Sequence, residues 1–332
     1  MASTVRLGLT GDVMLGRKVQ ERQRNRPPEA VWGNLLDGLR ALDGLLVNLE
    51  CALSTRGKRW TRTHRPFHFR ADPSWAVPAL DAAGVDCCAL ANNHILDFGA
   101  VALRDTLDAL DGAGIERAGA GRDLDEALSP ARFPVGGLDV AVVSFTDNTP
   151  EYAADADGPG TAHVEMDPAV DPTRDRVSEA LWRAREGDPD LLVASLHWGP
   201  NMVVDPPPEF EAFGRWLVDR GVDLVHGHSA HVFQGIEVYD GAPIIYDAGD
   251  FVDDYAVDRD LRNDRSFLFE ALVDADGVTE LRLRPVEIRG CSVHAAAGET
   301  ARWCRDRMRE LSEPFGTASA FERDGTELVL PV

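Results

Sequence analysis

The residues best suited to chemistry in this chain stand in five short polar motifs, each of which follows an apolar stretch. The motifs are Gly11-Asp12, Asn48-Leu49-Glu50, Asn92-Asn93-His94, His197-Trp198-Gly199 and Gly227-His228-Ser229-Ala230-His231. Carboxylate, amide and imidazole groups together suit borderline divalent ions such as Mn²⁺, Fe²⁺, Zn²⁺ or Ni²⁺, rather than an oxygen-only Ca²⁺ site or a thiolate zinc site. The residue types therefore predict one or two such ions. A central carboxylate could bridge two ions, and Glu50 is the candidate.

The positions of these motifs predict that they meet in space. Each motif lies where a β-rich run ends, and in open α/β sheets the ligand crevice lies at the carboxyl ends of the strands. Any one motif has an ordinary explanation, because a lone Gly-Asp pair is most often a turn and a lone histidine is most often a hydrogen-bonded structural residue. Five such motifs in succession favour one shared metal site.

Apolar runs and amphipathic stretches alternate along the chain, which is the pattern of an α/β protein. The predicted strands are Val5–Met14, Leu45–Leu49, Val85–Leu90, Leu138–Phe145, Leu191–Leu196, Leu224–His226, Pro243–Tyr246, Ser266–Val273 and Val278–Ile288, the last two joined by an Asp276-Gly277 hairpin turn. The predicted helices are Pro28–Leu42, Ser74–Ala83, Val101–Leu110, Arg174–Arg185, Glu209–Asp219 and Gly298–Leu311. The segment Thr149–Asp175 is expected to be a loop that forms a lid or a surface excursion.

No internal repeat or linker divides the 332 residues, so we expect a single domain over residues 1–332, with a motif-bearing core at 5–255 and a C-terminal hairpin and helix at 266–332.

The formal net charge of −22 creates a field that disfavours nucleic acid and anionic membrane as partners. The chain enters its first strand without a signal region, and no uncharged apolar run reaches about 18 residues, so we predict a cytoplasmic protein. The five irregularly spaced cysteines are expected to be reduced thiols.

The motifs GDVMLGR, NLE, ANNHILDFG, HWGP and GHSAHVFQ resemble those of the CapA (poly-γ-glutamate synthesis protein) family, a branch of the calcineurin-like metallophosphatase superfamily. The resemblance covers roughly residues 5–255 and implies a metallophosphatase-like αββα double-sheet sandwich. It also implies a set of ligands: Asp12 and His231 bind one ion, Asn93, His197 and His228 bind the other, and Glu50 bridges. His94 would then be the acid/base residue beside the metals.

Two motifs depart from the broader superfamily. The first usually reads Asp-x-His, whereas here Asp12 is followed by Val13 and Met14. Asn48-Leu49-Glu50 stands where phosphatases carry Gly-Asp-x-x-Asp. Both changes are typical of the CapA branch, and they put phosphatase activity and full occupancy of the first metal in question.

Other polar residues have two interpretations each. Asp97 either orients the imidazole of His94 or caps a helix. Arg17 and Arg65 either clamp a substrate carboxylate or are salt-bridged surface residues, since the chain has 32 Arg.

Three further histidines and one turn are expected to be structural. His64 and His68 lie in a predicted loop near the site. His226 is expected to face away from His228 and to pack. The Gly249-Asp250 turn has two interpretations, as a turn that reaches the site or as a turn alone, and the turn role is favoured.

Several functions fit this interpretation. A metal-bound water attacks a phosphoester or amide while His94 protonates the leaving group, which makes the protein a hydrolase. A soluble component of poly-γ-glutamate biosynthesis is a second possibility, against which the charge and the missing anchor count. A non-enzymatic metal-dependent binding protein is a third, and it would not need His94 free of ligation.

The resemblance also includes soluble members associated with epimerisation of the C-terminal residue of ribosomally made lasso-type peptides. Metals that hold a terminal carboxylate acidify Cα–H and stabilise the enediolate, while His94 removes the proton. We favour this peptide epimerase (isomerase) function, with a peptide or another carboxylate-bearing molecule as substrate.

Overall fold

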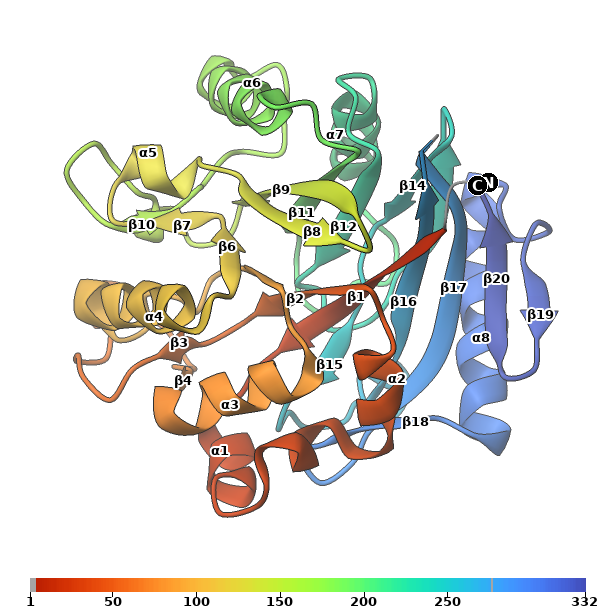
Figure 1. Cartoon of the computed structure of the whole chain (residues 1–332), viewed down its shortest axis with the longest axis horizontal. Helices are drawn as coiled ribbons and strands as arrows, with labels where there is room; N and C mark the ends of the chain where they lie inside the picture. The colour runs from red at the N-terminus through yellow and green to blue at the C-terminus, as the bar shows by residue number, and fades with distance from the viewer. Residues whose placement is uncertain (1–3, 276) are drawn as a thin grey trace.

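The computed structural model describes residues 4–275 and 277–332, and its two large β-sheets pack face to face (Figure 1). The strands of the first sheet, in pairing order, are β19 (Glu322–Asp324), β20 (Glu327–Pro331), β17 (Gly277–Ile288), β16 (Arg265–Asp274), β1 (Val5–Val13), β2 (Gly44–Leu49), β5 (Cys87–Ala89) and β6 (Glu116–Ala118), with β15 (Asp250–Val252) beside β1 and β18 (Val293–Ala295) beside β17. β1, β2, β5 and β6 pair in parallel, and β15 is parallel to β1.

The second sheet runs β13 (Ile236–Tyr239), β14 (Ala242–Ile245), β12 (Leu224–His228), β11 (Leu191–His197), β9 (Leu138–Thr146) and β8 (Ala131–Val135). Its central strands β9, β11, β12 and β14 are parallel. Two small pairs complete the strands of the described residues: β3 (Ala52–Leu53) with β4 (Arg70–Ala71), and β7 (Ala120–Gly121) with β10 (Gly160–Thr161).

Helices cover the outer face of each sheet (Figure 1). The first sheet is covered by α3 (Pro73–Ala83) and α4 (Gly99–Ala113), and the second by α6 (Asp171–Arg185) and α7 (Pro208–Val218). The other helical elements are α1 (Arg17–Gln23), α2 (Leu36–Arg40), α5 (Leu124–Ala127) and α8 (Gly298–Ser312), with the 3₁₀ turns η1 (Pro28–Leu35), η2 (Pro150–Tyr152) and η3 (Glu313–Phe315).

The apolar residues of each strand point alternately to the two faces of its sheet. In β2, Leu46 lies in the core between the sheets, whereas Leu45 and Val47 pack under the helices. In β9, Val142 faces the same inter-sheet core and Val143 faces the helices. Because successive strand residues point to opposite faces, strands that are apolar on both faces are buried on both. The chain is therefore an αββα double-sheet sandwich, and the predicted fold class is confirmed.

Two element predictions were wrong. The expected helix Pro28–Leu42 is instead η1 and α2, interrupted at Gly33, whose φ of 51° is not helical. A Cβ there would lie 2.3 Å from the Val293 carbonyl oxygen, so close backbone contact decides this break. The segment Thr149–Asp175 is not a free lid: Tyr152 and Ala162 are buried, β10 pairs with β7, and α6 already starts at Asp171.

The predicted Asp276-Gly277 turn includes Asp276, which lies outside the described residues. The strands on either side of it do pair, as β16 with β17. Among the described helices, none combines the length and apolarity that a membrane span requires. We keep the single domain over residues 1–332 as a proposal, supported by the pairing of the C-terminal β16 with the N-terminal β1.

Candidate metal centre and active site

The polar motifs meet where the carboxyl ends of the parallel strands from both sheets lie together. Near the end of β1, Asp12 is in register with Asn48 of β2 on one side and Asp250 of β15 on the other. In the second sheet, His197 of β11 is opposite His228 of β12. Parallel pairing brings all these strand ends to one edge.

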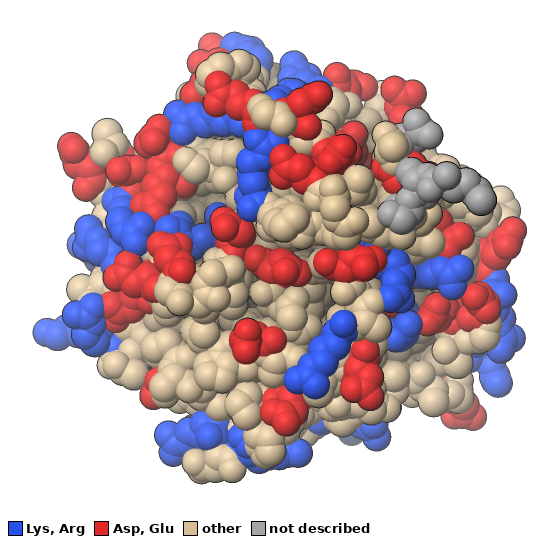
Figure 2. Space-filling view, in the orientation of Figure 1, with Lys and Arg blue, Asp and Glu red and all other residues tan. Residues whose placement is uncertain are grey.

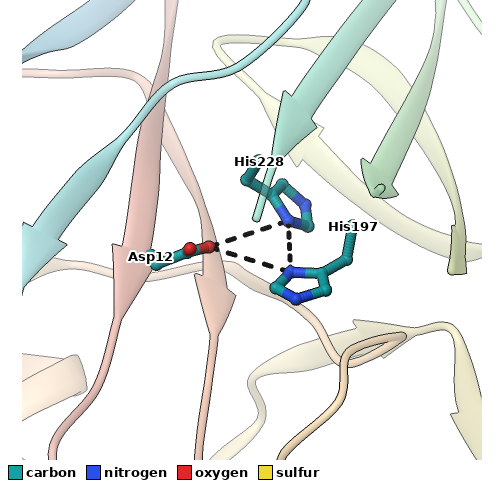
Figure 3. Close-up of side chains that lie close together, drawn as sticks. All are labelled: Asp12, His197 and His228. Carbon is teal, nitrogen blue, oxygen red and sulfur yellow. Dashed lines mark hydrogen bonds and ion pairs between the residues drawn. The ribbon is translucent and has the colours of Figure 1, made fainter. Parts of the chain in front are cut away.

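Figure 3 shows one group of ligand-capable side chains, with Asp12 from the first sheet and His197 and His228 from the second. Asp12 Oδ1 lies 3.9 Å from His197 Nδ1 and 3.8 Å from His228 Nδ1, and the two ring nitrogens are 3.0 Å apart. All three side chains are buried. Their ligand atoms lie within 4.8 Å of one another, which is close enough for one shared cation.

A second group shares Asp12 with the first. His231 Nδ1 lies 3.2 Å from Asp12 Oδ2 and 2.8 Å from Asp250 Oδ1. His231 has a φ of 61° and Ser229 a φ of 116°, so the loop after β12 holds two non-glycine residues in the left-handed region. Such strain persists only where the surroundings impose it, and it is frequent at ligand sites.

Glu50 and Asn93 stand beside these groups. Glu50 Oε1 is 4.0 Å from His197 Nε2, and Glu50 Oε2 accepts a hydrogen bond from the Tyr255 hydroxyl at 3.0 Å. Five buried polar atoms of the candidate ligands have no hydrogen-bond partner among the described residues: Asp12 Oδ2, Glu50 Oε1, Asn93 Oδ1, His197 Nε2 and Asp250 Oδ2. Buried polar atoms are normally satisfied, and a divalent cation held by oxygen and imidazole donors would satisfy such atoms. The residues therefore fit the ion that the motifs predict.

The charges of the group also fit a cation. Burial lowers the pKa of His197 to about 3 and lowers the pKa of His228 well below its usual value, so both rings are neutral, as metal ligands must be. Burial, together with the nearby Asp12 carboxylate, raises the pKa of Glu50 well above its usual range. Burial also opposes ionisation of Asp12, but His231, His197 and His228 outweigh it and lower the pKa of Asp12. A bound cation would likewise stabilise the ionised carboxylate of Asp12 against the cost of burial.

His94 and Asp97 form a buried pair at the edge of the cluster. His94 Nδ1 lies 2.5 Å from Asp97 Oδ2, and Asp97 also accepts hydrogen bonds from the Phe69 amide at 2.7 Å and the Tyr152 hydroxyl at 3.0 Å. Burial lowers the pKa of His94 against the opposing effect of Asp97. The carboxylate thus orients a neutral ring with its proton on Nδ1, which leaves Nε2, 3.8 Å from Glu50 Oε1, able to accept a proton. Of the two interpretations of Asp97, this geometry supports the orienting one.

The sequence matches the model of a protein family described as "Bacterial capsule synthesis protein PGA_cap" over residues 6–255. The chain belongs to the PGA_cap family. It is accordingly a CapA-like protein of the metallophosphatase-like superfamily, and the recognition from the motifs is confirmed. Members of such families bind divalent metals, in agreement with the Asp and His groups described above.

Relatives of this PGA_cap chain carry related names. It is 35% identical to a Mycobacterium tuberculosis protein named as a polyglutamine synthesis accessory protein, over 99% of this chain and 96% of that protein. It is 32% identical to "Capsule biosynthesis protein CapA" of Bacillus anthracis, over 74% of this chain and 59% of that protein. A solved structure of a hypothetical protein from Thermus thermophilus aligns with a TM-score of 0.46 and 16% identity, over 87% of this chain and 96% of that one.

A cavity of about 540 Å³ opens beside the candidate metal centre, and its lining includes Asn93, His94, His231, Tyr255, Arg17 and Arg65. The two arginines differ in their contacts. Arg65 donates to Thr149 Oγ1 at 2.6 Å and to the Asn93 carbonyl oxygen, and it lies over the Tyr152 ring, so its donors mostly hold loops together.

The Arg17 side chain contacts aromatic rings and one carboxylate, in contrast to that of Arg65. Its guanidinium carbon is 5.2 Å and 5.1 Å from the ring centroids of Phe67 and Phe69, and Asp254 holds one of its nitrogens at 2.8 Å. Its φ of 48° is in the left-handed region, and its Nη1 has no hydrogen-bond partner among the described residues. Arg17 is therefore the better candidate of the two for an anionic group of a substrate.

Two assignments from the sequence need correction. Asp250 belongs to the second candidate ligand group, so the Gly249-Asp250 pair does reach the site, and the turn role that the sequence favours is not its only role. The sequence contains a signal for this role, because Gly249-Asp250 repeats the Gly11-Asp12 pair. In the structure, β15 lies parallel to β1.

The second correction concerns His226, which does not face away from His228. Ser195 Oγ contacts both His226 Nδ1, at 3.2 Å, and His228 Nε2, at 2.9 Å. Residues two apart in a strand share a face, so the expectation was wrong on geometric grounds. His226 does pack, as predicted: it is buried and its Nε2 lies 2.8 Å from the Thr10 carbonyl oxygen. His68 contacts the Trp60 carbonyl oxygen at 3.0 Å, whereas His64 is exposed.

Proposed function

We propose that this PGA_cap chain is a metal-dependent enzyme that acts on a peptide and epimerises Cα of a C-terminal residue, such as that of a ribosomally made lasso-type peptide. The observation that carries the proposal is the His94–Asp97 pair, whose free Nε2 faces the carboxylate and imidazole cluster beside a cavity lined by basic residues. A cytoplasmic location, predicted from the sequence, goes with this proposal.

In this proposal Asp12, Asp250, His231, His197, His228, Asn93 and Glu50 hold one or two ions. A divalent ion bound there would act as a Lewis acid on the substrate carboxylate and so acidify the neighbouring Cα–H. His94 accepts that proton at Nε2, because Asp97 keeps Nδ1 occupied. Tyr255 also lines the cavity, with Lys18, His231 and Asp254. Its hydroxyl, which donates to Glu50 Oε2 at 3.0 Å, is the candidate to return a proton.

Hydrolysis is the second candidate, because the chain belongs to a metallophosphatase-like superfamily. In that case His94 gives a proton to a leaving group instead of taking one from carbon. Relatives named for capsule and polyglutamine synthesis also make a role in polyglutamate synthesis possible for this chain. All three functions use the same metal centre, so the chemistry at Cα must separate them.

The experiment is an incubation of the metal-supplied protein with a candidate peptide in D₂O. Epimerisation breaks and remakes one C–H bond, so we expect a one-dalton gain at a single residue, mixing of D and L forms there, and no new fragment. Chelator should abolish the gain. The His94→Ala protein is the matched control and should leave the peptide unlabelled.

Two results would count against the epimerase. A shortened peptide or released phosphate, without deuterium in the remaining substrate, would establish hydrolysis. Labelling that is equal in the wild-type and His94→Ala proteins would remove His94 from the mechanism.

A further inference from the structure

One segment of this acidic chain combines many cationic residues with no acidic residue. Residues 51–71 hold six of the 34 Lys and Arg residues and none of the 56 Asp and Glu residues: Arg56, Lys58, Arg59, Arg62, Arg65 and Arg70. We call this stretch the basic segment. On the face shown in Figure 2, by contrast, acidic and basic side chains alternate. The concentration of positive charge in one segment therefore needs an explanation other than average composition.

The basic segment forms a wall of a second cavity, of about 520 Å³. The cationic or titratable basic residues that line this cavity are Arg17, Lys18, Arg59, Arg70 and His68. Only two acids line it, Glu21 and Asp72. Asp72 is already used, because its Oδ1 accepts from the Ser74 amide at 2.9 Å and so caps α3. Cations thus exceed free carboxylates in this cavity.

Two of these cations, Arg59 and Arg70, have no acidic partner in the described part of the chain, whereas Arg17 pairs with Asp254. Among the described residues, no acid lies within ion-pair distance of Arg59 or Arg70. Arg70 donates to the Arg56 carbonyl oxygen at 2.6 Å, and its guanidinium carbon lies 4.0 Å from the centroid of the Phe98 ring. Burial and the neighbouring Arg59 lower the pKa of Arg70, which is the direction expected when like charges are held together without an anion. Arg56 differs, because it pairs with Asp105.

The second cavity adjoins the cavity beside the metal centre. Arg17 and Lys18 line both of them. A ligand that extends from His94 past Arg17 therefore reaches Arg59 and Arg70. Since clefts lined by one sign of charge focus the local field, this path attracts anions in spite of the net charge of −22.

We propose that the second cavity is an oxyanion subsite that binds carboxylates of an acidic peptide, upstream of the residue that reacts at the metal centre. The proposal rests on the proposed peptide substrate and adds its chemical class. Arg59 and Arg70 bind the carboxylates, and Arg17 and Lys18 connect this subsite to the reacting end.

The test is a binding measurement that needs no turnover. Two synthetic peptides of equal length and identical C-terminal residue are titrated into the metal-supplied protein by calorimetry, one with Glu at three upstream positions and the other with Gln. We expect the Glu peptide to bind about tenfold tighter or more, as charge-assisted hydrogen bonds would give. Arg59→Gln/Arg70→Gln should bring this ratio close to one. Arg302→Gln/Arg307→Gln removes the same charge from α8 and should keep the ratio.

The outcomes separate the possibilities. Equal affinity of the two peptides for the wild-type protein overturns the subsite, as does a ratio that persists in Arg59→Gln/Arg70→Gln. Equal loss of the ratio in both double variants shows a general field effect and overturns it too. If the double variant does not fold, the exposed single variant Arg59→Gln must still lower the ratio. Inorganic phosphate that competes only in the wild-type protein shows recognition of any oxyanion, and absence of competition shows selectivity for carboxylates.

The result is also independent of the reaction. If the D₂O experiment fails while the Glu preference and its loss are observed, the subsite stands and the proposed epimerisation falls. If deuterium exchange occurs but the Glu preference is absent, the reaction stands and the subsite falls.

Discussion

At the scale of single residues, Asp12 is the side chain on which the two candidate ligand groups meet. Its Oδ1 faces His197 and His228, and its Oδ2 faces His231. Asn48 Nδ2 also donates to Asp12 Oδ1 at 2.6 Å, which fixes the carboxylate orientation. A carboxylate that presents one oxygen to each group would be able to bridge two ions if both groups held one.

The first prediction concerns metal content. We expect Asp12→Ala to lower the number of divalent ions per chain more than Asp250→Ala, because Asp12 contributes to both groups and Asp250 to one. Glu50→Ala should match Asp12→Ala if Glu50 bridges, as the motif resemblance implies. Elemental analysis after purification with Mn²⁺ or Zn²⁺ measures this. The exposed Asp260→Ala protein is the control. An equal number of bound ions per chain in all the variants would contradict the assignment of Asp12, Asp250 and Glu50 as metal ligands.

The second prediction concerns His94. Because Asp97 already binds its Nδ1, the ring is positioned for proton transfer. We expect His94→Ala to keep most of its metal and its fold but to lose activity by roughly 10²–10⁴-fold, the usual range for acid–base catalysis. Activity and metal content are measured on the same preparation. A loss of metal in proportion to activity would make His94 a ligand instead.

At the scale of elements, the close approach of β1 to the segment that precedes β15 brings Asp12 and Asp250 together. A Cβ at Gly11 would lie 1.8 Å from the Gly249 carbonyl oxygen, and the Asp12 amide donates to that same oxygen at 2.9 Å. The Gly249 oxygen belongs to the backbone, and the position of a Cβ is fixed by the backbone at residue 11. Neither atom can therefore rotate away as the end of a flexible side chain would. Gly11 is therefore required for this approach.

The third prediction follows from this contact. We expect Gly11→Ala to separate β1 from residue 249, to lower the melting temperature by several degrees and to reduce metal content. Gly112→Ala in α4 is the matched control, since a Cβ there meets nothing within 4 Å. Alanine in a helix interior should be neutral or stabilising by about 0.5–1 kcal/mol. Unchanged stability and metal content in Gly11→Ala would show that the strands tolerate separation.

At the scale of the whole molecule, burial of many titratable groups between the sheets makes stability depend on pH. Burial and Asp12 raise the pKa of Asp247 to about 8, so this carboxyl stabilises the fold below its unfolded pKa and loses that contribution as pH rises through about 8. Burial lowers the pKa of His197 to about 3 and of His226 to about 4, so their contribution is present above the unfolded value and is lost as pH falls. Between about 4 and 6.5 the two effects oppose each other.

The fourth prediction uses the window above the unfolded pKa of histidine, where the groups with a raised pKa dominate. These are the Asp247 carboxyl and His231, whose pKa Asp250 and Glu50 raise well above its usual value although burial opposes this. For chelator-treated protein we expect the melting temperature to fall between about pH 6.5 and pH 8, because histidines no longer titrate in the unfolded chain there whereas Asp247 must ionise when folded. Asp247→Asn should flatten this slope, and added metal should also reduce it. A melting temperature that rises across the window would contradict the assignment.

The sequence by itself determined the elements and the kinds of ligand. Alternation and apolar runs identify strands such as Val5–Met14 and Leu191–Leu196, because a buried sheet requires apolar residues on both faces. Polar residues near the carboxyl ends of such runs, as at Asp12 and His197, are exceptions to that rule and so identify the site. The motif order was also sufficient to recognise the family.

Only the tertiary structure decided which motifs touch. Asp12 contacts His197 and His228 because two separate sheets pack with their strand ends together, and no local pattern encodes the register between sheets. The same holds for Asp250, which β15 brings beside β1 across more than two hundred residues of sequence. Arg17 and Arg65 looked alike as isolated arginines, and only packing separated one that ties loops together from one held against aromatic rings. Contacts distant in sequence depend on how faces pack, and a linear pattern specifies the faces but not their partners.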